Sequence, residues 1–132
     1  PGVYPFYDAQ QWELGTVGPG RIALTAVATV VSLRGDRVVV DAGSKILSPD
    51  RPAYASGHGR LPAQPGARVV ALSEHHATIV WPANAALPAL GERVRIAPNH
   101  VCTAINLVDE LVVERSGAET SVWVVAARGR NT

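Results

Sequence analysis

The feature that most constrains the fold is a run of β-branched and small residues at positions 22–33, IALTAVATVVSL. Its apolar side chains occupy both odd and even positions, which is typical of a strand buried on both faces. Arg34-Gly35-Asp36 interrupts the run, and Val38-Val39-Val40 resumes it. The two stretches predict a β-hairpin with Gly35 in its turn. We interpret Arg-Gly-Asp as part of that turn rather than as an adhesion motif, because a tripeptide match is weakly specific.

Further short runs of the same kind follow. They occupy residues 68–72, 78–81, 93–97, 107–114 and 121–126, with Ser116-Gly117 as a turn between the last two. Only residues 8–14 resemble a helix, with Asp8 as its N-cap. The pattern predicts an all-β domain over residues 1–132, an antiparallel-dominated barrel or sandwich with a short N-terminal helical segment. Its predicted core residues are Val27, Val31, Val39, Val70, Ile79, Val94, Ile96 and Val124.

A long irregular segment at residues 42–66 is rich in Gly and Pro. It is too long to be an idle connection in a compact domain, and loops of this length are often functional. Within it, Gly57-His58-Gly59 would let the backbone approach a ligand or partner closely. A flexible solvated loop is the preferred interpretation of these three residues.

Composition excludes several function classes. The chain has a net charge of +1 and 5% aromatic residues, which argues against an OB-like nucleic-acid binder. It has neither a signal peptide nor an apolar run long enough to span a membrane, so we expect no membrane partner. One cysteine excludes an internal disulfide framework and favours a reducing, cytoplasmic setting. Because the chain contains no Met, we interpret it as processed or as a piece of a longer protein.

The sharpest local motif is Pro98-Asn99-His100-Val101-Cys102-Thr103. On an extended backbone, residues two apart point to the same side, so His100 and Cys102 are candidate ligands of one metal ion. Imidazole nitrogen and thiolate are ligands that Zn²⁺ favours. Two protein ligands leave open positions, which suits a Lewis-acid site. The alternative is a small buried cysteine beside a hydrogen-bonded histidine.

Several segments, in order along the chain, resemble the C-terminal domain of the D-serine dehydratase and D-threonine aldolase family. They are Phe6-Tyr7-Asp8-Ala9, Ala23-Leu24-Thr25, residues 28–32, residues 39–45, Ser73-Glu74, residues 98–103 and residues 126–129. The resemblance implies a β-domain beside an alanine-racemase-like barrel, which carries the lysine that binds pyridoxal phosphate (PLP) and is absent from this chain. It also implies that His100 and Cys102 hold a divalent metal, zinc in the dehydratase branch. The family pattern Ser-Glu-Glu-His-Gly is met here by Ser73-Glu74-His75-His76-Ala77, so His75 and Ala77 depart from it.

The implied parent is a PLP- and metal-dependent lyase of D-3-hydroxy amino acids, active as a homodimer. PLP would withdraw electrons while the metal polarises the β-hydroxyl, leading to D-serine dehydration or D-threonine retro-aldol cleavage. We assign no catalytic or PLP-binding residue to this chain, interpret Lys45 as structural, and expect the isolated domain to be inactive. His58, His75 and His76 are the next metal ligands to test. The alternative function is a non-catalytic β-module for metal binding or domain assembly.

Overall fold

Eight strands and four short helical segments make up the part of the chain that the computed structural model describes, residues 2–117 and 119–130. In chain order they are α1 (Ala9–Glu13), the 3-10 helix η1 (Pro19–Arg21), β1 (Ala26–Arg34), β2 (Arg37–Val40), α2 (Ser44–Leu47), β3 (Gly59–Arg60), β4 (Arg68–Leu72), β5 (Ala77–Val80), β6 (Arg93–Pro98), α3 (Val101–Asn106), β7 (Glu110–Val113) and β8 (Ser121–Val124). The expected antiparallel all-β class and the short N-terminal helix α1 are confirmed, whereas η1, α2 and α3 were not predicted.

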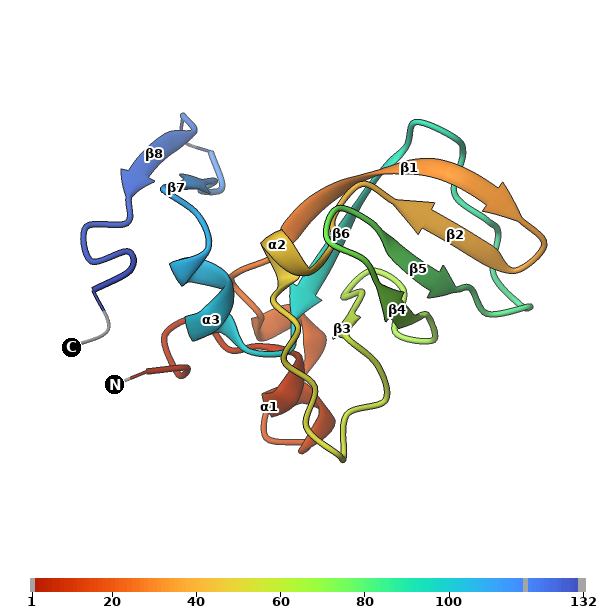
Figure 1. The fold of residues 1–132 in the computed structure, drawn as a ribbon, viewed down its shortest axis with the longest axis horizontal. Helices are drawn as coiled ribbons and strands as arrows, with labels where there is room; N and C mark the ends of the chain where they lie inside the picture. Colours follow the sequence, from red (N-terminus) through yellow and green to blue (C-terminus); the bar gives the residue numbers. More distant parts are fainter. Residues whose placement is uncertain (1, 118, 131–132) are drawn as a thin grey trace.

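Six strands form one antiparallel sheet in the order β3-β6-β1-β2-β5-β4 (Figure 1). The sheet curls into a nearly closed barrel, because its two ends meet beside β4: the backbone N–H of His58 donates to the carbonyl of Val69 at 2.8 Å. The predicted hairpin is β1–β2, and Gly35 in its turn has φ +60°. A Gly tolerates this left-handed conformation at little cost.

Gly57-His58-Gly59 is the segment that closes the barrel, and its two glycines are buried. A Cβ on Gly57 would lie 2.5 Å from the carbonyl oxygen of Val69. The interpretation as a flexible solvated loop is therefore wrong: the glycines are needed because two backbones approach each other closely.

The core faces the inside of the barrel. Three predicted core residues, Ile79, Val94 and Ile96, are buried as expected. The other five are wrong: Val39 is half-buried, and Val27, Val31, Val70 and Val124 are exposed. In β1, β2 and β4 the opposite parity is buried, with Ala28, Val30, Val38, Val40 and Val69 in the core. Val31 and Val70 each follow a buried residue, Val30 and Val69, so the ordinary alternation of a strand turns them outward. Register shifts also lie at these points, between Val30 and Ser32 and between Val69 and Ala71.

Strands β7 and β8 pair only with each other and lie at one side of the barrel, next to α3 (Figure 1). The predicted strand at residues 107–114 begins only at Glu110, because α3 and its C-cap Leu107 occupy the residues before it. Similarly, β1 begins at Ala26 rather than at residue 22. None of the described helices is long and apolar enough to cross a membrane.

Candidate metal centre

His100 and Cys102 lie where β6 ends and α3 begins. The backbone of His100 is extended (φ −128°, ψ 108°) and forms the N-cap, whereas Cys102 is the second residue of the helix. The prediction that His100 and Cys102 share an extended backbone is therefore wrong, because α3 starts at Val101. The His100 side chain is 34% exposed and Cys102 is exposed, so both side chains remain accessible from solvent.

Asp8 fixes this junction from the other end of the chain. Its side chain is fully buried. Oδ1 accepts a hydrogen bond from the backbone N–H of Gln11 at 3.1 Å, which makes Asp8 the N-cap of α1 as predicted. Oδ2 accepts from the N–H of Val101, also at 3.1 Å, and lies 3.9 Å from Nδ1 of His100. One carboxylate thus satisfies N–H groups at the starts of two helices.

Asn99 ties the same junction to the long segment at residues 42–66. Its buried side-chain amide donates to the carbonyls of Asp50 and Gly57, both at 2.8 Å. One helical turn further on, the Thr103 hydroxyl donates to the Asp50 carboxylate at 2.7 Å. The long segment therefore supports the loop that carries His100 and Cys102, a role that its Gly/Pro composition did not reveal.

The donor set does not form a closed metal site. No group of three or more His, Cys, Asp or Glu side chains in residues 2–117 and 119–130 could hold a metal ion. A structural zinc site needs four protein ligands. An imidazole and a thiolate beside solvent can supply two, with the remaining positions filled from outside these residues.

The other histidines lie on different elements. His58 is in the barrel-closing segment, where burial and the charge of Arg51 lower its pKa from the ordinary value, and its Nδ1 has no hydrogen-bond partner among the described atoms. His75 and His76 are exposed in the β4–β5 turn, where Nε2 of His75 lies 3.4 Å from Nζ of Lys45.

Lys45 is the one lysine of the chain. Its exposed ammonium pairs with Glu74 at 2.8 Å, and its backbone N–H donates to the Glu74 carbonyl at 3.1 Å. A Schiff-base lysine needs a desolvated or otherwise activated amine. Lys45 does not fit that role, and its contacts agree with the structural role predicted for it.

A buried ion pair, which the sequence analysis missed, holds α1 against the long segment. Arg60 Nη1 lies 2.8 Å from Glu13 Oε1, and the guanidinium stacks over the Trp12 ring at 3.9 Å. Burial opposes ionisation of Glu13, but hydrogen bonds from Ser56 and Arg60 outweigh it and lower the pKa of Glu13. The pair lies at the C-terminal end of α1, whose N-cap is Asp8.

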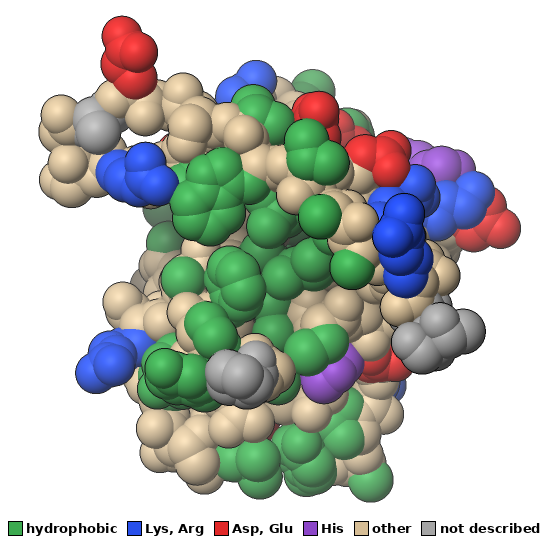
Figure 2. Space-filling view, turned by 90° about the vertical axis from the view of Figure 1, so that its left-hand side faces the viewer, with side chains coloured by type: hydrophobic (Ala, Val, Ile, Leu, Met, Phe, Trp, Pro, Cys, Tyr) green, Lys and Arg blue, Asp and Glu red, His purple; other side chains and the backbone are tan. Residues whose placement is uncertain are grey.

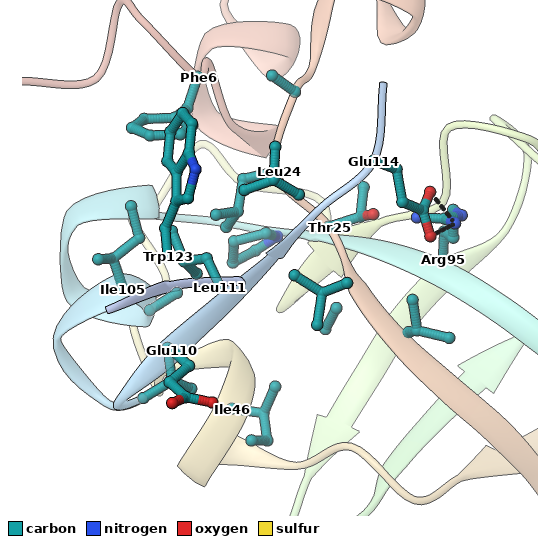
Figure 3. Close-up of a pocket in the computed structure, with 18 of the residues that line it drawn as sticks. Phe6, Leu24, Thr25, Ile46, Arg95, Ile105, Glu110, Leu111, Glu114 and Trp123 are labelled. Atoms are coloured by element: carbon teal, nitrogen blue, oxygen red, sulfur yellow. Dashed lines mark hydrogen bonds and ion pairs between the residues drawn. The ribbon is translucent and has the colours of Figure 1, made fainter. Parts of the chain in front are cut away.

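An apolar groove of about 660 Å³ lies between the β7–β8 hairpin and the barrel. Figure 2 shows hydrophobic side chains gathered on this face, where the surface is hollowed. Phe6, Leu24, Ile105, Leu111 and Trp123 line it, and Arg95 pairs with Glu114 at its rim through contacts of 2.7 and 3.0 Å (Figure 3). Helix α3 thus contributes both Cys102 and a wall of the groove.

Comparison with known proteins places the chain in a family. A family profile described as a putative serine dehydratase domain matches residues 23–114. The chain is 34% identical to the solved D-threonine aldolase of Filomicrobium marinum, with a TM-score of 0.80 over 100% of this chain and 36% of that one. It is 26% identical to the solved D-threo-3-hydroxyaspartate dehydratase of Delftia sp. HT23, with a TM-score of 0.79 over 92% and 37%. The chain therefore belongs to the serine dehydratase domain family, as the resemblance indicated.

The relatives differ greatly in length. An uncharacterised protein of Mycobacterium tuberculosis is 56% identical over 130 residues, which are 94% of this chain and 97% of that protein. The two solved enzymes, in contrast, are covered over little more than a third of their length. A D-threo-3-hydroxyaspartate dehydratase variant with a cysteine replaced by alanine has been solved in a metal-free form.

Proposed function

We propose that this chain is the metal-carrying β-domain of a PLP-dependent lyase that acts on D-3-hydroxy amino acids, by dehydration or by retro-aldol cleavage. The observation that supports it most is the junction of β6 and α3. There two zinc-type ligands, His100 and Cys102, are accessible from solvent while buried Asp8 and Asn99 hold the backbone beneath them. Rigid support of this kind is what a metal-ligand pair requires.

The chain's own residues would perform two tasks. His100 and Cys102 would hold a divalent metal, zinc by donor type, and the exposed side of the pair would admit substrate oxygen or water. When bound, the metal would supply Lewis acidity toward the β-hydroxyl and PLP, held by another domain, would supply an electron sink. Because Asp8 caps α1 and α3 together, the ligand loop would keep its shape when substrate enters and leaves.

We further propose that the apolar groove docks the PLP-holding domain. The related enzymes contain about two thirds of a chain beyond this domain. Ile105 lines the groove from the same helix whose first turn carries Cys102. A domain seated in the groove would therefore adjoin the proposed metal ligands. Two exposed apolar residues that line the groove, Val27 and Val112, would become covered there too.

A second candidate function is a non-catalytic module for metal binding or domain assembly. It is favoured by the mycobacterial relative, which this chain covers over 97% of its length. Homodimerisation and a cytoplasmic location stay predictions.

A domain exchange distinguishes the two functions. This chain would replace the corresponding third of the Filomicrobium D-threonine aldolase, to which it is similar over its full length. The chimera should bind PLP and cleave D-threonine or dehydrate D-serine when zinc is added. His100→Ala or Cys102→Ala in the chimera should abolish turnover without releasing PLP. A folded, PLP-loaded chimera without turnover would contradict the lyase proposal and support the non-catalytic module.

A further inference from the structure

We propose that Asp8 is the positioning residue for His100: its buried carboxylate selects the Nδ1–H tautomer of the imidazole and leaves Nε2 as the metal-binding nitrogen. The inference rests on the proposed function, because it states how the site of that function is oriented. It concerns Asp8, a residue that the sequence analysis placed only at a helix cap.

The His100 imidazole lies beside the carboxylate of Asp8. Nδ1 of His100 lies 3.9 Å from Oδ2 of Asp8. This distance is longer than a hydrogen bond, so the interaction is electrostatic. A neutral imidazole presents either an N–H or a lone pair at Nδ1. A carboxylate attracts the first and repels the second; here the carboxylate is fully buried and the imidazole is 34% exposed.

The carboxylate cannot easily turn away from the ring. Both oxygens accept backbone hydrogen bonds, one from Gln11 and one from Val101, each at 3.1 Å. The preceding residue, Tyr7, has φ +55°, a left-handed conformation that is rare for a bulky side chain. Strain of this kind persists only where the surroundings fix it, and it is concentrated at functional sites. The backbone is thus held in an unfavourable conformation immediately before the residue that faces His100.

In metal sites, the partner of the second histidine nitrogen affects how the first nitrogen binds the metal. A histidine that binds a metal through one nitrogen usually presents its other N–H to a carboxylate or carbonyl, which sets the tautomer and raises ligand basicity. Asp8 stands in that position relative to His100. Because Asp8 caps the first helix and His100 follows β6, the proposed metal ligand would be oriented by a residue 92 positions earlier in the chain.

The first test needs no metal and no variant. Long-range ¹H–¹⁵N correlation spectra of the imidazole rings, recorded at a pH where histidine is neutral, report which nitrogen carries the proton. His100 should be protonated at Nδ1, the opposite of the tautomer that neutral histidine prefers in water. Protonation at Nε2 in the unaltered protein would overturn the inference.

The second test uses Asp8→Asn, which removes the charge and keeps an acceptor oxygen for one of the two backbone N–H groups that Asp8 caps, so the tautomer of His100 is the readout that separates the charge from the caps. His100 should shift toward the Nε2–H tautomer, and zinc affinity, measured by competition with a chromophoric chelator, should fall about 10- to 100-fold. The matched control is Asp41→Asn, since Asp41 also accepts a backbone N–H, from Thr29 at 2.6 Å. The control should change neither quantity. Equal zinc affinity in Asp8→Asn and the unaltered protein would overturn the inference.

The outcomes separate this inference from the proposed function. An Nδ1–H tautomer that depends on Asp8, in a protein that binds no zinc, would support the orientation of His100 and contradict the metal site. Zinc that binds through His100 and Cys102 with the same affinity in Asp8→Asn would support the metal site and contradict the orientation of His100 by Asp8.

Discussion

Oδ2 of Asp8 accepts a hydrogen bond from the backbone N–H of Val101 at 3.1 Å, although the two residues lie 93 positions apart in the chain. The bond joins the first helix to the loop that carries His100 and Cys102. Val101 N–H is one of the donors that the short helix α3 cannot satisfy internally. The start of the chain therefore determines where the candidate metal ligands lie, through one buried carboxylate.

Replacing this carboxylate should destabilise the fold. Asp8→Ala removes caps from α1 and α3 together, and each lost cap costs about 0.5–2 kcal/mol. We expect a loss of about 1–4 kcal/mol in the free energy of unfolding, measured by urea denaturation. Asp36→Ala, at an exposed turn, is the control and should change stability by less than about 0.5 kcal/mol. Equal effects of the two substitutions would contradict the role of Asp8.

Closure of the barrel depends on Gly57. Gly57→Ala would place a methyl group 2.5 Å from the carbonyl oxygen of Val69, a rigid backbone atom. We expect a destabilisation of about 1–3 kcal/mol by chemical denaturation, in the range of overpacking substitutions. Gly18→Ala, where no atom lies within 4 Å of the added Cβ and φ is −88°, is the matched control. Unchanged stability in Gly57→Ala would show that the two backbones do not meet as described.

His58 should make stability fall in mild acid. Burial and the charge of Arg51 lower its pKa below the ordinary 6.5, so the unfolded chain binds a proton more readily than the folded one. By proton linkage, the contribution of neutral His58 to the free energy of unfolding is fully present above pH 6.5 and is lost as the pH falls through the lowered pKa. His58→Gln should flatten this part of the stability profile, whereas His75→Gln, at an exposed position, should not. Thermal melts between about pH 5 and 8 compare the three proteins.

Lys45 should not form a stable PLP adduct. Its amine is exposed and paired with Glu74, so nothing activates it as a nucleophile. Borohydride reduction after incubation with PLP, followed by mass spectrometry, should show little modification of the chain's one lysine. Stoichiometric, saturable trapping at Lys45 would instead assign cofactor binding to this domain.

The sequence predicted the strands well because β-branched runs and turn residues are local signals. It failed for side-chain direction in β1, β2 and β4, because runs with apolar residues at both parities do not show which face meets the core. It also missed α3, since six residues between two strands carry too weak a helical pattern. Asp8 was predicted as a cap of α1, but its contact with Val101 depends on tertiary structure and has no local signature.

Zinc titration of the unaltered chain, His100→Ala, Cys102→Ala and the exposed control His75→Ala tests the central claim most directly. We predict weak one-to-one zinc binding to the unaltered chain and to the control. Binding should release protons and weaken as the pH falls, because thiolate and neutral imidazole are the forms that bind zinc. Binding should be lost in His100→Ala and in Cys102→Ala. Zinc retained at full affinity in both of these variants would contradict the account and direct the search to His58, His75 and His76.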